Sequence, residues 1–130
     1  MEVGPLSTNC YLVWEDGSGK VTIIDPGEDA LAILTRVGEL GLEVERILAT
    51  HCHFDHIAGA AGLKAATGAP FVIHEGDATF VEDAVKAAHR WGFDIEKPPV
   101  PDLYVKDGDG ITVGSAAFEA IHTPGHSPGG

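Results

Sequence analysis

Short apolar runs and longer amphipathic stretches alternate along this chain, and turn residues separate them. Aliphatic, aromatic and β-branched residues at 9–14, 20–24 and 44–50 predict strands. Between the second and third runs, apolar residues recur every three positions from 31 to 40, which predicts a helix over 28–40 that ends before Gly41. The first half of the chain therefore has the alternating strands and helices of an α/β protein.

The same alternation continues to the end of the chain. We expect a helix at 57–66, where Gly59 and Gly62 would allow close packing against the preceding strand. Three prolines exclude regular structure from the loop at 92–101, and such a loop between core elements often shapes a substrate pocket. The other predicted elements are strands at 70–73, 103–105, 111–113 and 116–121, and a helix at 77–89.

The residues after the strand at 44–50 concentrate side chains that can coordinate a metal. They read His51-Cys52-His53-Phe54-Asp55-His56. If the strand continues into this motif, His51 and His53 point to the same side and can share one metal, whereas Cys52 faces away. Asp55 and His56 come from the following turn and can aim at a second point nearby. Metal binding explains three imidazoles in six positions better than a structural role does, because each buried imidazole needs a partner.

This motif fits the signature His-x-His-x-Asp-His at every fixed position, and the chain resembles the metallo-β-lactamase superfamily. Residues 4–13 look like the first hairpin of its glyoxalase II-like members, and residues 21–27 are similar to their second strand, which ends in Asp-Pro-Gly. Residues 121–129 match their third-ligand motif, Thr-Pro-Gly-His-[Thr/Ser]-x-Gly. The order and spacing agree over essentially the whole chain. The resemblance implies an α/β fold of the four-layer αββα sandwich type.

By that resemblance, His51, His53 and His126 would hold a first metal, and Asp55 and His56 would belong to a second. Asp55 would also be catalytic, because it would orient a metal-bound water. Zinc is the implied metal, with two sites in the complete family fold and iron or manganese as other occupants. Three imidazoles suffice for a tetrahedral zinc with one open position.

Asp25 ends the strand at 20–24, and the sequence leaves two roles open for it. It could orient a metal ligand from outside the coordination shell, or it could cap the turn into the helix that follows. Of the other histidines, His74 is expected to have a surface role, with a place in the cleft as the alternative, and His89 a favourable position near the end of a helix. His122 is expected to be a hydrogen-bonding support, with metal ligation as the alternative.

The family pattern also includes residues that this chain does not contain. Family members carry a later aspartate that bridges two metals and a final histidine near the carboxyl end, and this chain ends at Gly130 without them. We therefore expect a single domain over residues 1–130 that is truncated, with its carboxyl-terminal part absent. Such a fragment would leave one sheet face partly uncovered, which predicts that the chain alone either self-associates, as a dimer or by domain swapping, or is poorly stable.

Charge and composition narrow the classes of partner. Acidic residues outnumber Lys and Arg by 20 to 8, for a formal charge of −12, which argues against nucleic acid and against anionic membranes. No apolar run approaches the ~20 residues that span a bilayer, and the amino terminus lacks a signal-peptide pattern. A cytoplasmic protein with a small-molecule substrate is the expectation.

The function implied by the resemblance is metal-dependent hydrolysis of an acyl thioester by metal-activated water. Two alternatives stay open, a mononuclear iron persulfide dioxygenase of the same superfamily and a non-catalytic metal-binding fragment. A serine hydrolase is rejected although residues 125–129 satisfy Gly-x-Ser-x-Gly. The residue after Ser127 is Pro128, which has no N–H to donate to an oxyanion hole.

Overall fold

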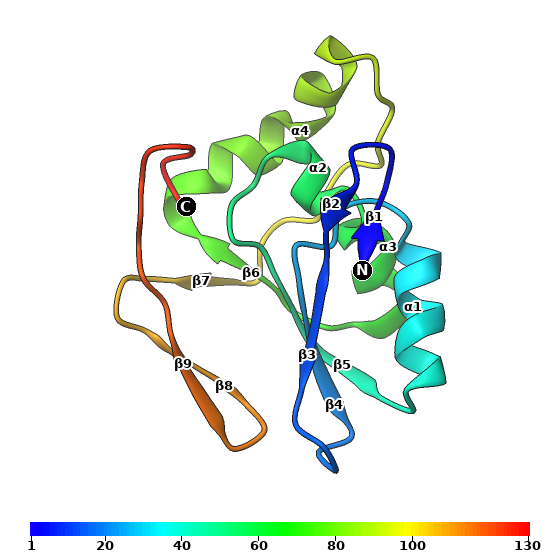
Figure 1. Cartoon of the computed structure of the whole chain (residues 1–130). Coiled ribbons are helices and arrows are strands. Elements are labelled where there is room, and N and C mark those ends of the chain that lie inside the picture. The colour runs from blue at the N-terminus through cyan, green and yellow to red at the C-terminus, as the bar shows by residue number, and fades with distance from the viewer.

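The computed structural model describes all 130 residues and shows a mixed sheet with helices packed on it (Figure 1). The strands and helices are, in order, β1 (Glu2–Val3), β2 (Thr8–Asn9), β3 (Tyr11–Trp14), β4 (Lys20–Ile24), α1 (Ala30–Glu39), β5 (Glu43–Leu48), α2 (Phe54–Ile57), α3 (Ala60–Thr67), β6 (Phe71–His74), the 3₁₀ helix η1 (Glu75–Asp77), α4 (Ala78–Arg90), β7 (Leu103–Val105), β8 (Gly110–Val113) and β9 (Ala116–Glu119).

Five strands form the main sheet in the order β3-β4-β5-β6-β7. β3 and β4 are antiparallel, and β4, β5, β6 and β7 run parallel to one another. Parallel neighbours require crossover connections, and here α1 joins β4 to β5 while α2 and α3 join β5 to β6. The carboxyl ends of β4, β5 and β6 therefore meet at one edge of the sheet, where ligand sites of α/β proteins gather.

The core lies between this sheet and its helices. Ile23, Ile47 and Phe71 come from the three central strands and are fully buried, as are Ile33 of α1 and Leu63 of α3. In Figure 1, α1 and α3 lie to one side of the sheet, and the β8–β9 hairpin lies to the other. Burial of aliphatic side chains from strands and helices in one cluster is the main stabilising contribution to this half of the fold.

The other face of the sheet is only partly covered. A cavity of about 400 Å³ lies between this face and the hairpin. Ile24 and Leu48 line it from the sheet, and Ile111, Val113 and Phe118 line it from the hairpin. The hairpin thus forms the beginning of a second β layer against the first.

The predicted elements are all present, with ends that differ by a few residues. The strand expected at 44–50 ends at Leu48, and the one expected at 116–121 ends at Glu119. The helix expected at 57–66 corresponds to α3, and a separate short helix that was not predicted, α2, precedes it, with a break at Ala58 and Gly59. The loop at 92–101 has no helix or strand, as predicted.

The two glycines, Gly59 and Gly62, pack against a different segment from the one predicted from the sequence. A Cβ on Gly59 would lie 2.9 Å from the Pro26 carbonyl oxygen, and the Gly59 N–H donates to that same oxygen. A Cβ on Gly62 would lie 2.9 Å from the Ala30 Cβ at the start of α1. Both glycines therefore allow close approach to the β4–α1 connection rather than to the preceding strand.

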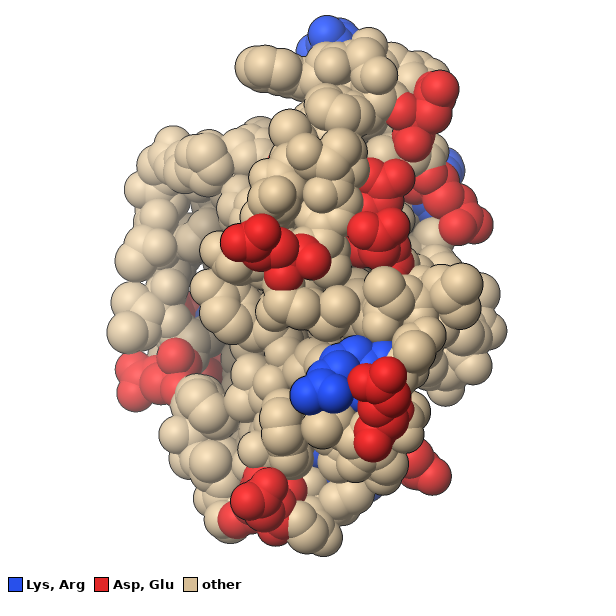
Figure 2. Space-filling view, turned by 45° about the vertical axis from the view of Figure 1, so that its right-hand side comes forward, with Lys and Arg blue, Asp and Glu red and all other residues tan.

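Acidic side chains dominate the charged surface. Figure 2 shows Asp and Glu in several separate groups over one face, with few Lys and Arg among them. No helix is both long and apolar enough to serve as a membrane span.

Candidate metal centre

Three imidazoles converge at the carboxyl edge of the sheet. One ring nitrogen from each of His51, His53 and His126 lies within 4.8 Å of the others. The ring centroids of His53 and His126 are 4.5 Å apart, and each ring is 4.8 Å from that of His51. The family resemblance therefore predicted correctly that these three side chains come together, although His126 is far from the other two along the chain.

The local backbone presents these ligands in a way that the sequence did not predict. Since β5 ends at Leu48, His51 and His53 lie on the loop that leads into α2, not on a continuing strand. Cys52 between them is buried, with its thiol in the core cluster. Burial raises the pKa of that thiol, with smaller contributions from Asp77 and Asp25. Cys52 thus serves as a small core residue, as expected.

The cluster has the properties of a site for a divalent metal. The Nε2 atom of His51 is buried and has no hydrogen-bond partner, an arrangement that is costly unless another group satisfies it. Burial lowers the pKa of His51, and the neighbouring His56 and His53 lower it further. Burial and the adjacent His126 likewise lower the pKa of His53. Lowered pKa values favour the neutral imidazoles that a metal requires, so the residues present fit a three-histidine site with an open position.

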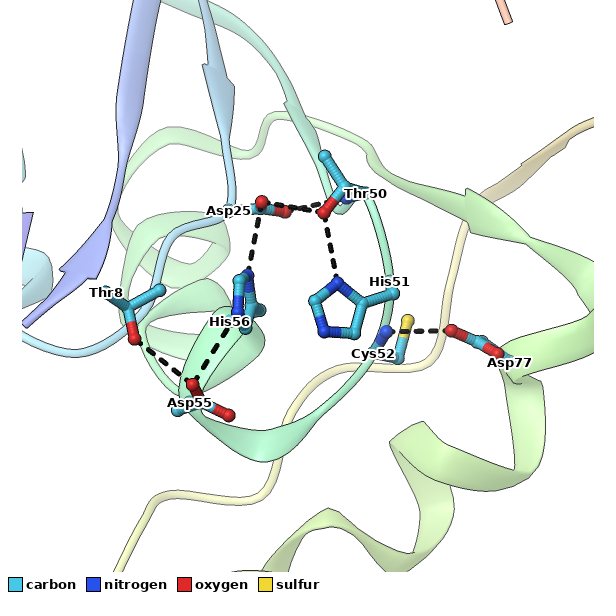
Figure 3. Close-up of polar contacts among 8 residues, drawn as sticks. All are labelled: Thr8, Asp25, Thr50, His51, Cys52, Asp55, His56 and Asp77. Atoms are coloured by element: carbon cyan, nitrogen blue, oxygen red, sulfur yellow. Dashed lines mark hydrogen bonds and ion pairs between the residues drawn. The ribbon is translucent and has the colours of Figure 1, made fainter. Parts of the chain in front are cut away.

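Asp25 supports the cluster from the end of β4. Its carboxylate accepts hydrogen bonds from the Thr50 N–H at 2.6 Å and from the Thr50 hydroxyl at 2.7 Å. The same hydroxyl lies 3.1 Å from Nδ1 of His51, so a chain of contacts runs from the carboxylate to the imidazole (Figure 3). Asp25 also lies 3.2 Å from Nδ1 of His56.

These contacts separate the two roles that the sequence left open for Asp25. Helix α1 begins after Asp29, and no side chain caps its amino terminus. The capping alternative is therefore wrong. The backbone of Asp25 has a φ of 52°, a left-handed conformation that aspartate tolerates better than most residues. The contacts match the other role, in which Asp25 orients imidazoles.

Asp55 and His56 lie beside the three-histidine cluster but do not join it. The ring centroids of His56 and His51 are 4.1 Å apart, and Nε2 of His56 is 3.6 Å from the Asp55 carboxylate. The Thr8 hydroxyl donates to Asp55 at 3.2 Å. Burial lowers the pKa of His56, but the hydrogen bond to Asp25 and the two nearby carboxylates outweigh it, so the pKa is raised overall.

Asp77 is a structural feature of the site that sequence reasoning missed. It is fully buried after β6, and its carboxylate accepts hydrogen bonds from residues of both histidine loops. The sequence indicated only that a helix starts near it, because an acidic residue at the start of a helix is commonplace. Ser127 is buried and donates to Asp77 at 2.9 Å, so its hydroxyl is committed to this contact rather than to nucleophilic attack.

The remaining histidines lie outside the cluster. Nε2 of His122 is 2.8 Å from the Pro128 carbonyl oxygen, and its ring stacks on His74 at a centroid distance of 4.1 Å. His89, in the last turn of α4, is 2.8 Å from the Asp94 carboxylate. His122 thus supports the loop that carries His126, as the sequence indicated.

A cleft of about 680 Å³ gives access to the cluster. His53, Asp55, His56 and His126 line one part of it. The opposite wall consists mainly of side chains from α4 and the residue after it, among them Phe80, Ala84, Ala87 and Trp91. The loop at 92–101 does not line this cleft, but its residues Phe93 and Ile95 line a smaller neighbouring pocket that also includes Asp55.

Comparison with known proteins agrees with this geometry. Residues 3–130 match the family model of the metallo-β-lactamase superfamily. The chain belongs to this superfamily. The hydroxyacylglutathione hydrolase of Haemophilus influenzae is 34% identical over 123 residues, which are 93% of this chain and 58% of that protein.

Two solved structures show the same fold. The crystal structure of TTHA1623 in a di-iron-bound form superposes with a TM-score of 0.89 at 38% identity, covering 99% of this chain and 62% of that one. The B3 metallo-β-lactamase BLEG-1 gives a TM-score of 0.88 at 34% identity, covering 98% and 62%. The α/β fold of the metallo-β-lactamase type is thus confirmed for the part present here, and this chain spans about 60% of the length of these relatives.

Proposed function

We propose that this chain carries the primary metal site of a metal-dependent hydrolase and that zinc occupies it, held by His51, His53 and His126. The observation that carries the proposal is the buried Nε2 atom of His51, which has no partner and faces two other imidazoles. A bound zinc ion would supply hydroxide near neutral pH and would polarise a substrate carbonyl.

The other residues of the site have roles that follow from their contacts. The Asp25 carboxylate and the Thr50 hydroxyl hold Nδ1 of His51, which leaves Nε2 directed at the cluster. Asp55 lines the cleft and would orient the attacking water, and its hydrogen bond from Thr8 fixes the carboxylate for that task. With His56, Asp55 would also contribute to a second metal position.

The proposed substrate is an acyl thioester. The hydroxyacylglutathione hydrolase of Haemophilus influenzae, with 34% identity, supports this class. The apolar wall that Phe80, Ala87 and Trp91 give the cleft fits the hydrocarbon part of such a molecule. This chain spans about 60% of its relatives' length and lacks the family's bridging aspartate and final histidine. We therefore propose catalysis for a protein in which this chain is joined to the residues that complete the second metal position.

A specific observation also favours iron as a second candidate metal. TTHA1623 was crystallised in a di-iron-bound form, and it is 38% identical to this chain. Iron in the purified protein, together with oxygen consumption on a persulfide substrate, would favour the dioxygenase alternative over hydrolysis.

The test compares metal content in two histidine variants. We expect about one zinc per chain in the unmodified protein, a large loss in His53→Ala and no change in His89→Ala. His89 is a matched control, because it pairs with Asp94 outside the cluster. Metal content would be measured by plasma mass spectrometry after purification without chelator, followed by assay against acyl thioesters. Equal metal content in both variants would refute the site assignment.

A further inference from the structure

The proposed ligands come from two loops that are distant in sequence, and one buried side chain touches both. His51 and His53 precede α2, whereas His126 lies beyond β9. Asp77, at the junction of η1 and α4, lies between the two loops and is fully buried. Burying a carboxylate is costly unless charges or hydrogen bonds compensate for it, so its contacts indicate what this position requires.

All the hydrogen bonds that compensate for burial of the Asp77 carboxylate come from the two histidine loops. Oδ2 of Asp77 accepts the Cys52 N–H at 2.8 Å and the Ser127 hydroxyl at 2.9 Å. Oδ1 accepts the Gly129 N–H at 2.6 Å. Cys52 lies between His51 and His53, and Ser127 directly follows His126. A single carboxylate therefore contacts a residue adjacent to each of the three proposed ligands, through a backbone N–H at Cys52 and a hydroxyl at Ser127.

The loop that carries His126 packs so closely against Asp77 and Gly76 that there is no space for a larger side chain at Gly129 or Gly76. A Cβ on Gly129 would lie 2.7 Å from Cγ of Asp77, and a Cβ on Gly76 would lie 2.9 Å from the Pro128 carbonyl oxygen. Residues 127 and 129 of the His-Ser-Pro-Gly motif are thus explained by Asp77. The serine supplies a hydroxyl donor, and the glycine lets its own N–H approach the carboxylate.

We propose that Asp77 is a positioning residue for the metal centre, which holds the His126 loop against the loop of His51 and His53. The proposal deepens the function proposed above and rests on it for the identity of the ligands. His126 is exposed, so its side chain gains little order from packing and depends on the placement of its loop. Removing a group that orients metal ligands typically weakens metal binding by about 10- to 100-fold.

The test uses two variants and one matched control. Ser127→Ala removes one of the three hydrogen bonds, and Asp77→Asn leaves one oxygen acceptor and turns an amide N–H toward a donor. Asp102→Asn is the control, because that carboxylate also accepts a backbone N–H, from Phe71 at 2.7 Å, but lies away from the histidines. Zinc Kd would be measured by competition with a chromophoric chelator, after circular dichroism confirms that each variant is folded.

We expect Kd to rise about tenfold in Ser127→Ala and more in Asp77→Asn, and to stay within about twofold in Asp102→Asn. A purely structural Asp77 would lower the melting temperature but leave the Kd of the folded chain unchanged. If Asp77→Asn does not fold, Ser127→Ala decides. Wild-type Kd in Ser127→Ala and in any folded Asp77→Asn would overturn the proposal.

A second readout separates this proposal from the proposed function. Amide hydrogen exchange of the metal-free chain reports directly on how firmly Asp77 holds the His126 loop, because the Gly129 N–H is protected by its hydrogen bond to Asp77. In Ser127→Ala we expect this amide to exchange at least several-fold faster, with the Phe71 amide unchanged. If the wild-type chain binds no zinc but the Gly129 amide still exchanges faster in Ser127→Ala, the proposed metal site is refuted and the positioning role of Asp77 is supported. Unchanged exchange of the Gly129 amide in Ser127→Ala would overturn the proposal that Asp77 holds the His126 loop in place.

Discussion

Replacement of Asp25 by alanine and by asparagine should destabilise the chain to very different extents. In the native structure the carboxylate accepts the N–H and the hydroxyl of Thr50, and the residue has a φ of 52°. Alanine removes both acceptors and tolerates this backbone poorly. Asparagine keeps one oxygen acceptor and, like aspartate, tolerates the left-handed region.

The magnitudes follow from these contacts. A hydrogen bond to a charged group contributes about 1.5–3 kcal/mol. The left-handed backbone costs an ordinary residue about 1–2 kcal/mol. Two lost bonds and this strain lower the free energy of unfolding by about 4–8 kcal/mol in Asp25→Ala. Asp25→Asn should lose about 1.5–3 kcal/mol, because one acceptor remains. Since domains have only about 5–15 kcal/mol of stability, the alanine variant should be largely unfolded or close to it.

The assay is urea denaturation of the metal-free chain, followed by fluorescence and circular dichroism. Metal must be absent, because a bound ion would stabilise each variant according to its affinity. The two variants should differ by at least about 2 kcal/mol. Equal destabilisation within about 0.5 kcal/mol would show that neither the second acceptor nor the backbone conformation of Asp25 matters, and the reasoning would fail.

Three further predictions concern zinc affinity at low pH, the stability of the metal-free chain at low pH, and a buried hydroxyl. At pH 5.5, three imidazoles with ordinary pKa values near 6.5 would each be about one-eleventh neutral, so zinc affinity would fall about 1,000-fold. Because the pKa values of His51 and His53 are lowered, we expect a smaller fall between pH 7.5 and 5.5, and a fall of the full size would contradict the burial argument. In the metal-free chain, the stability that these two histidines contribute is present above pH 6.5 and is lost as pH falls below it, whereas the raised pKa of His56 acts in the opposite direction. Separately, Oγ1 of Thr22 is buried without a partner, so Thr22→Val should raise the free energy of unfolding by about 1 kcal/mol, and a loss of stability in urea denaturation would contradict this.

The sequence was most informative where a local period or a local motif determines the structure. The amphipathic period of 28–40 predicted α1, and the apolar run before His51 predicted β5, because both depend on residues close in sequence. Convergence of His126 with His51 and His53 was predicted from the family resemblance. No local pattern places residues so far apart beside one another.

The parts that were missed depend on packing between distant segments. The break at Gly59 arises because the β4–α1 connection passes within hydrogen-bonding distance of its backbone, and no periodicity records that approach. Asp77 was missed for a similar reason. Its three partners become neighbours only when the loops at Cys52 and Ser127 fold onto it.

The order of the parallel strands explains why two carboxylates support one histidine loop. The loop follows β5, which lies between β4 and β6 in the sheet. Asp25 follows β4 and accepts the Thr50 N–H, whereas Asp77 follows β6 and accepts the Cys52 N–H. Two carboxylates, one following each neighbouring strand, therefore hold the loop by accepting its backbone N–H groups (Figure 3). Since these contacts need no metal, the loop of His51 should be ordered before metal binds, and loss of either carboxylate should weaken metal binding without removing a ligand.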